Sequence, residues 1–240
     1  MKVLDLFSGI GGFSLGLERA GMTTMAFCEI DKKAQQVLRK HWPNVPIFED
    51  VCTLTKELLD ERGITIDVIC GGFPCQDISL AGKGAGIEGE RSGLWTEYAR
   101  IISELRPKFV IVENVSALLS RGLDRVLGDL AEIGYDAEWH CIPASAVGLH
   151  HRRDRLWIVA YPCGFRNWRI KNPRVSESSR KATKQQLERF LERERQLAVP
   201  AGKRGGISDG ISNRVDRLKQ LGNAVVPQIP ELIGKAIMSC

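Results

Sequence analysis

The chain has 240 residues, of which 43% are hydrophobic and 26% charged, and its formal net charge is +5 at pH 7. This length holds one full domain plus a small insert, and the composition is that of an ordinary soluble globular protein. No apolar run approaches the roughly 20 residues of a membrane span, and the acidic start does not resemble a signal peptide, so we expect neither. The seven cysteines include no Cys-x-x-Cys pair, which argues against a disulfide scaffold or zinc knuckle and favours a reducing cytoplasm.

Short apolar runs alternate with amphipathic stretches over residues 1–161. The pattern predicts strands at 3–7, 24–28, 66–70, 109–113, 139–142 and 156–161, and helices at 12–20, 32–41, 94–105 and 123–133. Such alternation is typical of an α/β fold with a mostly parallel sheet. Beyond Tyr161 the chain becomes polar and irregular, with helical spacing over 184–197 and a Gly-rich stretch over 200–210. A closing helix is predicted at 229–238.

A glycine-rich turn, DLFSGIGGF at 5–13, follows the first predicted strand and opens the first predicted helix. Glycines let backbone approach a ligand closely, and a helix N-terminus offers unpaired N–H groups. Such turns serve dinucleotides, nucleosides and plain tight turns alike, and the Gly-Lys-Ser/Thr ending of a P-loop is missing. Glu29 and Asp50 follow at intervals of about 20 residues, where one carboxylate can bind a ribose diol and the other an adenine amine. The three features together favour an adenosine-type ligand.

A second turn, GGFPCQDIS at 71–79, follows the apolar run 66–70 and carries Cys75 at its tip. Two glycines and a proline force a sharp bend there. A thiol on rigid backbone at the end of a core strand is well placed to act as a nucleophile. The alternative is a structural cysteine, because free cysteine is among the most buried residue types.

Three later elements extend the pattern. Glu113 comes at the end of the apolar run 109–112, where the ligand crevice of an open α/β sheet lies; a helix N-cap region is the alternative. Alternation along the strand that follows HRRDR (151–155) places Arg153 and Arg155 on one face, unless this is a solvent-facing basic turn. Asn223, in QLGNAVVP (220–227) before the closing helix, either caps that helix or contacts a ligand.

The charge is concentrated in one segment. Residues 165–204 hold twelve Lys and Arg against four Glu, a net charge of +8, so the rest of the chain carries −3. A basic segment on a mildly acidic body suggests a polyanionic partner. The alternative is a solvated linker or an exposed helix.

These motifs, taken in order, resemble those of the C5-cytosine DNA methyltransferases of the bacterial or phage type. The matching set is DLFSGIGGF, Glu29, Asp50, GFPCQDIS, ENV (113–115), RDR (153–155) and GNAVV (222–226), which leaves out only about 50 residues after Tyr161. The resemblance implies a class I S-adenosylmethionine-dependent methyltransferase, with a Rossmann-like, mostly parallel sheet. It also implies a catalytic domain at 1–161 plus 213–240 and an unusually short basic target-recognition region at 162–212.

The implied reaction is methyl transfer to cytosine C5 in duplex DNA, without a metal. Cytosine C5 is a poor nucleophile, and addition of the Cys75 thiolate at C6 makes it reactive. Arginines nearby would help to ionise that thiol. Glu113 would hold cytosine N3 and the exocyclic amine, for which a proton-sharing carboxyl is useful. Arg155 would contact the base O2, and Arg153 would support the same site or a phosphate.

The resemblance also implies the contacts of the cofactor, S-adenosyl-L-methionine, whose product is S-adenosyl-L-homocysteine. Glu29 would bind the ribose hydroxyls and Asp50 the adenine amine. Ile30 and Val51 would enclose the adenine; position 30 is often tryptophan in relatives, so aliphatic packing replaces aromatic stacking here. The implied cofactor residues are Phe7, Ser8, Gly9, Gly11, Glu29, Ile30, Asp50, Val51, Pro74, Asn223 and Val225.

Duplex DNA is the implied partner, and the target base must be flipped out of it. Residues 76–95 contain five glycines with Lys83 and Arg91, so we expect a loop that closes over DNA and contacts phosphates, Ser79 included; an ordinary surface loop is the alternative. In the basic segment the expected DNA contacts are Arg166, Arg169, Lys171 and Arg174. A truncated or vestigial recognition module remains the alternative for that segment.

Two other functions stay open at this point. Transfer-RNA cytosine methyltransferases of the same fold carry Pro-Pro-Cys-Gln, whereas Phe73-Pro74-Cys75-Gln76 here favours DNA. An inactive DNA-binding relative would be expected to lack Cys75, Glu113 or the cofactor glycines, and all are present. We therefore expect a monomeric enzyme of the bacterial cytoplasm or nucleoid, with no obligate protein partner, serving a restriction–modification system or phage–host DNA modification.

Overall fold

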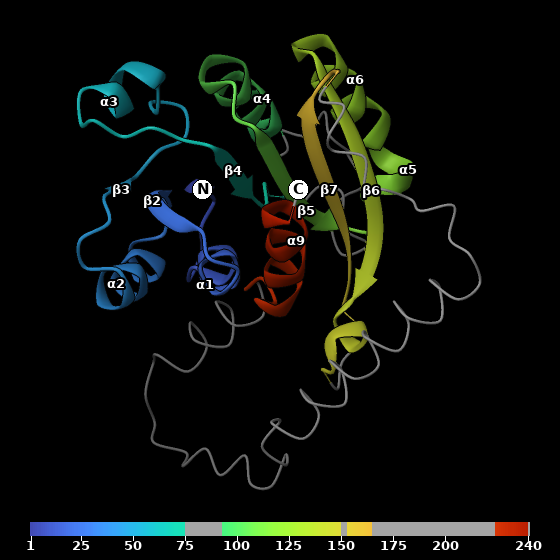
Figure 1. Ribbon diagram of the computed structural model, residues 1–240, viewed down its shortest axis with the longest axis horizontal. Helices are drawn as coiled ribbons and strands as arrows, with labels where there is room; N and C mark the ends of the chain where they lie inside the picture. Colours follow the sequence, from blue (N-terminus) through green and yellow to red (C-terminus); the bar gives the residue numbers. More distant parts are fainter. Residues whose placement is uncertain (75–92, 150–152, 165–223, 240) are drawn as a thin grey trace, which may run out of the picture.

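The computed structural model describes residues 1–74, 93–149, 153–164 and 224–239 (Figure 1). They build a seven-stranded sheet in the order β3-β2-β1-β4-β5-β7-β6. Its strands are β1 (Lys2–Leu6), β2 (Thr23–Cys28), β3 (Ile47–Phe48), β4 (Val68–Gly71), β5 (Phe109–Val115), β6 (Tyr135–Pro143) and β7 (Asp154–Pro162). Strand β7 runs antiparallel to both of its neighbours, and the other neighbouring pairs are parallel. The predicted α/β fold with a mostly parallel sheet is confirmed.

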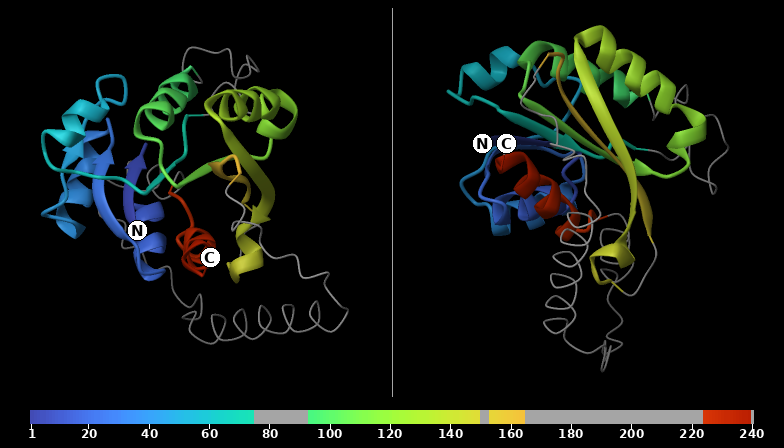
Figure 2. Two further views of the ribbon diagram at one scale, coloured as in Figure 1. Left: turned by 45° about the horizontal axis from the view of Figure 1, so that its top comes forward. Right: turned by 45° about the vertical axis from the view of Figure 1, so that its right-hand side comes forward.

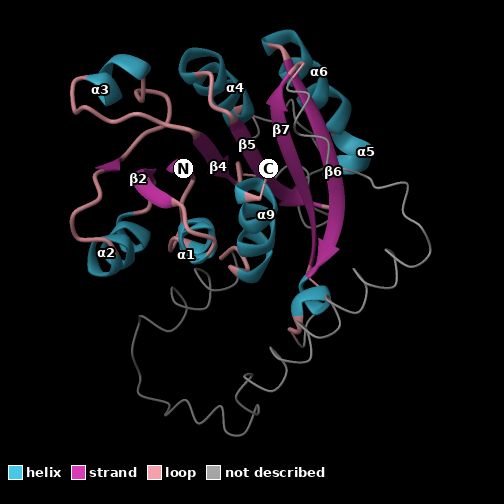
Figure 3. Ribbon diagram, in the orientation of Figure 1, coloured by secondary structure: helices cyan, strands magenta, loops and turns pink. Residues whose placement is uncertain are grey.

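Helices cover both faces of the sheet (Figure 3). The described helices are α1 (Gly12–Arg19), α2 (Lys32–His41), α3 (Lys56–Asp60), α4 (Leu94–Leu105), α5 (Leu118–Arg121), α6 (Leu123–Ile133) and α9 (Gln228–Met238), with a 3₁₀ turn η2 (Ala144–Val147). Side chains alternate along the strands: Val110 and Val112 of β5 pack with α4 and α6, whereas Phe109 and Ile111 pack with α1 and α9. Burial on both faces explains why the central strands read as continuous apolar runs.

The long periodic elements agree with the sequence prediction to within a few residues. The exceptions are short: β3 has two residues, α3 five and α5 four, and none was predicted. Strand β6 begins at Tyr135, four residues before the predicted start. The N-cap residue of α9 is Pro227, which makes no side-chain cap hydrogen bond; Asn223, expected either to cap this helix or to contact a ligand, lies outside the described residues. The helical spacing at 184–197 lies outside the described residues.

Helix α9 returns the end of the described chain to helix α1, against which it lies in Figure 2. The approach is close enough to require glycine. A Cβ on Gly16 would lie 2.2 Å from the Pro227 carbonyl oxygen, and a Cβ on Gly234 would lie 2.7 Å from the Ala20 Cβ. None of the helices in the described ranges has the length and apolarity of a membrane span.

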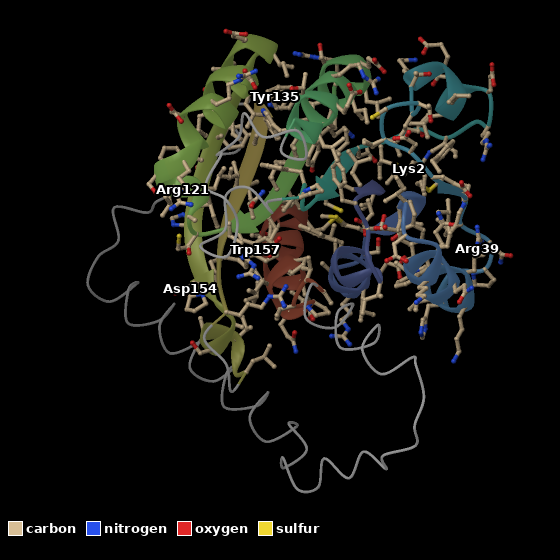
Figure 4. All side chains as sticks on the ribbon, turned by 180° about the vertical axis from the view of Figure 1, so that it is seen from behind. Lys2, Arg39, Arg121, Tyr135, Asp154 and Trp157 are labelled. Atoms are coloured by element: carbon tan, nitrogen blue, oxygen red, sulfur yellow. The ribbon has the colours of Figure 1, made fainter. Side chains whose placement is uncertain are left out.

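Because β7 is antiparallel to β5, it runs from the C-terminal ends of the parallel strands to their N-terminal ends. Arg155 pairs with Val115 at the C-terminal end of β5, and Pro162 pairs with Tyr135 at the start of β6. Figure 4 labels Asp154 and Tyr135 at these opposite ends. The described chain stops at Gly164 and resumes at Ala224, next to Val225, whose carbonyl oxygen would lie 2.5 Å from a Cβ on Gly12.

Candidate active site

The strand order reverses between β1 and β4, since the chain adds strands outward on either side of this pair. In open α/β sheets, ligands bind at the carboxyl ends of the strands at such a switch point. The two turns singled out in the sequence follow β1 and β4 directly. The fold therefore brings both of them to the same edge of the sheet.

The turn after β1 is held in a conformation that few side chains favour. Phe7, Gly9 and Gly11 all have positive φ, at 52°, 54° and 85°, which glycine adopts freely and phenylalanine only when the surroundings require it. Ser8 anchors the turn: its hydroxyl donates to the carbonyl of Asp5 at 2.6 Å, and its backbone N–H donates to Cys28 at 3.2 Å. An added Cβ on Gly9 would meet nothing within 4 Å, so open space lies beside this backbone.

Glu29 closes the turn from β2. One carboxylate oxygen accepts the N–H of Gly9 at 2.7 Å, and the other accepts the N–H of Asp31 at 2.7 Å. Burial raises the pKa of Glu29, against the effect of those two hydrogen bonds. The next residue, Ile30, is 74% exposed, so its apolar side chain is accessible beside the turn.

Asp50 and Val51 come from the segment after β3. The carboxylate of Asp50 accepts the N–H of Cys52 at 2.9 Å, and Val51 is buried. The segment is fastened to α4 by Arg100, whose guanidinium donates to the carbonyl oxygens of Val51 at 3.1 Å and Leu54 at 3.0 Å. This contact was not predicted from the sequence.

The turn after β4 lies against the end of β5. A Cβ on Gly72 would lie 2.9 Å from Oε2 of Glu113, so the Glu113 side chain occupies the space that any larger residue at 72 would fill. Asn114 donates from its side-chain amide to the carbonyl of Phe73 at 3.3 Å. The Asn114 hydrogen bond holds the turn at Phe73, one residue before Pro74, the last described residue before Cys75.

Glu113 forms an ion pair across the β5–β7 ladder. Its Oε1 lies 3.1 Å from Nε of Arg155, and the pair is diagonal because Arg155 is opposite Val115 while Glu113 is opposite Trp157. Burial raises the pKa of Glu113, and the charges of Arg155 and Arg153 oppose that rise without cancelling it. Burial and the neighbouring Arg155 lower the pKa of Arg153.

The structure thus decides two alternatives left by the sequence. Glu113 lies within β5 and not at a helix N-cap, because the N-cap of α5 is Ala117. Arg155 forms an ion pair with Glu113, and both Arg153 and Arg155 are partly buried, so they do not form a solvent-facing turn.

The predicted site residues fall into three groups. The first lies around the turn after β1: Phe7, Ser8, Gly9, Gly11, Glu29 and Ile30, with Asp50 and Val51 on the neighbouring segment and Val225 behind Gly12. The second lies at the ends of β4, β5 and β7: Pro74, Glu113, Arg153 and Arg155. The third is outside the described residues: Cys75, Ser79, Lys83, Arg91, Arg166, Arg169, Lys171, Arg174 and Asn223.

Three contributors were missed by sequence reasoning. Gly72 and Asn114 sit inside motifs that were recognised, but their roles depend on contacts between β4 and β5. Arg100 is flanked on its helix by Glu97 and Glu104, to which it donates at 2.8 and 2.7 Å. This i−3 and i+4 spacing reads as an ordinary surface ion-pair set, so its sequence signal is weak.

Comparison with known proteins decides the family. The model of the C-5 cytosine-specific DNA methylases matches residues 1–206. The chain belongs to this family. Members of the C-5 cytosine-specific methylase family use S-adenosylmethionine, and the mixed α/β sheet seen here is the class I methyltransferase fold.

Individual relatives agree with the assignment to the C-5 cytosine-specific methylases. The Type II methyltransferase M2.BsuMI of Bacillus subtilis is 39% identical over 168 residues, covering 67% of this chain and 42% of the relative. The Type II methyltransferase M.CviJI of a Paramecium bursaria Chlorella virus is 41% identical over 161 residues, covering 66% and 42%. The crystal structure of a prophage-encoded DNA modification methyltransferase from Escherichia coli superposes with a TM-score of 0.58 at 28% identity, covering 68% and 47%. The chain matches less than half the length of each of these relatives.

Proposed function

We propose that this protein is a DNA (cytosine-5)-methyltransferase, which transfers a methyl group from S-adenosylmethionine to C5 of a cytosine flipped out of duplex DNA. The observation that carries the proposal is the buried Glu113 carboxyl, paired with Arg155 at 3.1 Å and lying against Gly72. That carboxyl lies beside the turn that ends in Pro74-Cys75. A cytosine ring placed there would meet the Glu113 acid and the Arg155 cation, and the proposed nucleophile Cys75 directly follows Pro74 in the sequence.

The turn after β1 fits the cofactor. Open space beside Gly9 and the exposed face of Ile30 suit a ligand that has both polar and apolar surfaces. The Glu29 carboxylate would take the ribose hydroxyls, Asp50 the adenine amine, and Ile30 and Val51 the faces of the adenine. Phe7, Ser8, Gly11, Pro74, Asn223 and Val225 complete the proposed set. When bound, S-adenosylmethionine supplies an electrophilic methyl group.

Cys75 would act as the nucleophile. Its thiolate adds to C6 of cytosine, and the electron pair of the 5,6 double bond becomes available at C5 to form the bond to the methyl group. A base then removes the proton from C5, and the pair returns to the double bond as the sulfur leaves C6. The contacts of Gly72 and Asn114 support this role, because they fix the backbone that leads to Cys75.

Glu113 would stabilise the negative charge that develops on the base during attack. A carboxyl with a raised pKa holds its proton more readily near neutral pH and can donate it toward N3, while its other oxygen accepts from the exocyclic amine. Burial supplies that rise in pKa. Arg155 would keep the carboxyl in place and contact the base O2, and Arg153 would support the same site or a phosphate.

Duplex DNA is the proposed partner. The +8 charge over 165–204 supports DNA contacts in the proposed recognition region at 162–212, at Arg166, Arg169, Lys171 and Arg174, and the loop after Cys75 would add Ser79, Lys83 and Arg91. Residues 1–161 and 213–240 would form the catalytic domain. The Type II relatives support a role in restriction–modification, for which we propose a monomer in the bacterial cytoplasm.

Covalent capture tests the proposal. A randomised duplex carrying 5-fluorocytosine is incubated with the protein and S-adenosylmethionine, because fluorine at C5 blocks the final elimination. We expect a stable protein–DNA adduct whose tryptic peptide maps to Cys75, and no adduct with Cys75→Ser. A parallel incubation with 5-fluorocytosine-containing transfer RNA separates the two polynucleotide substrates. Absence of any adduct with DNA would refute the proposal.

A further inference from the structure

Arg100 occupies an unusual position for a helix-surface arginine. Its Nη2 donates to the backbone carbonyls of Val51 and Leu54, its Nε to Glu97 at 2.8 Å and its Nη1 to Glu104 at 2.7 Å. The side chain is 30% exposed. Four hydrogen bonds use most of the five donors of a guanidinium, so the group is held in a single orientation.

The segment that Arg100 holds is buried through the side chains of Val51 and Leu54, but its link to the sheet by strand pairing is short. Strand β3, which precedes it, pairs with β2 over two residues only. Within the segment, the N–H of Thr53 reaches the Asp50 carbonyl at 3.2 Å and the N–H of Leu54 reaches Val51 at 3.4 Å. The N–H of Cys52 also donates to the Asp50 carboxylate at 2.9 Å and the Thr53 hydroxyl to the Asp50 carbonyl at 3.1 Å, so these bonds shape the turn but stay within the segment. Its place relative to the sheet therefore depends on core packing and on the hydrogen bonds from Arg100 of α4.

A second contact from the same network supports this reading. Glu104, which accepts from Arg100, also accepts the N–H of Lys56 at the start of α3 through its other oxygen, at 3.2 Å. Arg100 and Glu104 thus fasten both ends of the stretch from Val51 to Lys56 to one helix. The planar fork of arginine suits two carbonyl oxygens and two carboxylates at once, which a lysine ammonium does not match.

We propose that Arg100 is a positioning residue for the adenine end of the cofactor site and sets the selectivity for the adenine 6-amino group. It acts through the backbone of Val51, which precedes Leu54 and follows Asp50, the residue proposed to accept that amine. This inference rests on the proposed function, because it assigns Asp50 and Val51 to the adenine. Without the fork, the segment would shift away from the cofactor while Glu29 and the turn after β1 remain in place.

The test compares two ligands on the full chain by isothermal titration calorimetry: S-adenosylhomocysteine and S-inosylhomocysteine, which carries a 6-oxo group in place of the amine. The variants are Arg100→Lys and Arg100→Gln. We expect the wild type to prefer the adenosine ligand. Both variants should bind it roughly tenfold more weakly, as expected for the loss of hydrogen bonds to a charged group, and should lose most of the preference.

Arg106→Gln is the matched control. Arg106 lies at the end of the same helix, and its guanidinium also donates to a backbone carbonyl, that of Ile133, at the sheet edge opposite the site. It should lower the melting temperature without changing the preference between the two ligands.

The outcomes separate the inference from the proposed function. If the wild type binds neither ligand, the proposed cofactor site is wrong. If the wild type binds with the expected preference and both Arg100 variants keep the same ratio of affinities, Arg100 has only a structural role and the inference fails. Arg100→Lys keeps the charge, so it provides the answer if Arg100→Gln does not fold.

Discussion

The two halves of the proposed site present different kinds of chemical group. Around the turn after β1, the structure presents backbone: positive-φ residues, an N–H bound to Glu29 and open space beside Gly9. At the ends of β4, β5 and β7 it presents charged side chains, with Glu113 buried against Arg155 and near Arg153. The half around the turn after β1 offers open space and a backbone fixed by hydrogen bonds, which suits the binding of a cofactor. The half at the ends of β4, β5 and β7 brings an acid and cations together at one place, which suits catalysis.

Glu113→Gln should give the largest difference between the two halves, because it should lower the rate of methyl transfer without weakening cofactor binding. The substitution keeps the shape of the side chain but removes the carboxyl proton, so kcat for methyl transfer should fall by roughly 100- to 10,000-fold. Affinity for S-adenosylhomocysteine should stay within about twofold, because Glu113 is not among the residues proposed to contact that ligand. Radiolabelled methyl transfer and calorimetry measure the two. A parallel loss of cofactor affinity would show that the halves are not independent.

The ion pair of Glu113 and Arg155 should make the rate of methyl transfer depend on pH. Because burial raises the pKa of Glu113, the protonated form persists to higher pH than in a free glutamate, and methyl transfer that needs this form should decline as the pH rises through the raised pKa. Arg155→Gln removes an opposing charge, so the same decline should move to higher pH. The profile of kcat against pH for the two proteins is the measurement. A shift to lower pH would contradict the assigned roles.

Gly72→Ala should have an intermediate effect. Its Cβ would lie 2.9 Å from Oε2 of Glu113 and 3.3 Å from the Glu113 carbonyl oxygen, so the carboxyl must move, and kcat should fall by at least about tenfold. Gly128→Ala in α6 is the control, since a Cβ there meets nothing within 4 Å and alanine favours helix by about 1 kcal/mol. Equal activity of Gly72→Ala and wild type would exclude the close contact.

Substitution of Asp5 should have the smallest effect, and it tests only the half of the site around the turn after β1. This buried acid accepts the hydroxyl of Ser14 at 2.7 Å, and burial raises its pKa to about 8. Between its unfolded pKa and about 8 the folded state keeps the proton while the unfolded state releases it, so stability falls as pH rises, by up to about 1.4 kcal/mol per pH unit. Asp5→Asn should flatten that slope in urea unfolding at about pH 5, 6 and 7. An unchanged slope would mean that Asp5 is ionised in the folded protein.

The contrast between the halves also explains what the sequence could predict. The turn after β1 is local, so glycines, a strand before and a helix after were enough to place it. The diagonal pair of Glu113 and Arg155 depends on the register between β5 and β7, which are separated by about 40 residues; alternation predicted that Arg153 and Arg155 share a face but not their partner.

Arg100 was beyond prediction for a related reason. Its helix was predicted with the observed ends, yet the carbonyls that it binds belong to a turn that follows a strand of two residues. Such a strand has no periodicity to detect. The family motifs likewise identified both Glu113 and Gly72. They did not show that the Glu113 carboxyl leaves no room for a side chain at position 72.

The reversed direction of β7 has a consequence for exchanging recognition segments between enzymes. The chain leaves the sheet at Pro162, at the end far from the proposed site, and the described chain resumes at Ala224, next to Val225 beside Gly12. The nine residues of β7 separate the two ends of the sheet by roughly 30 Å. A module transplanted into the proposed recognition region would therefore need about ten extended residues to span that distance.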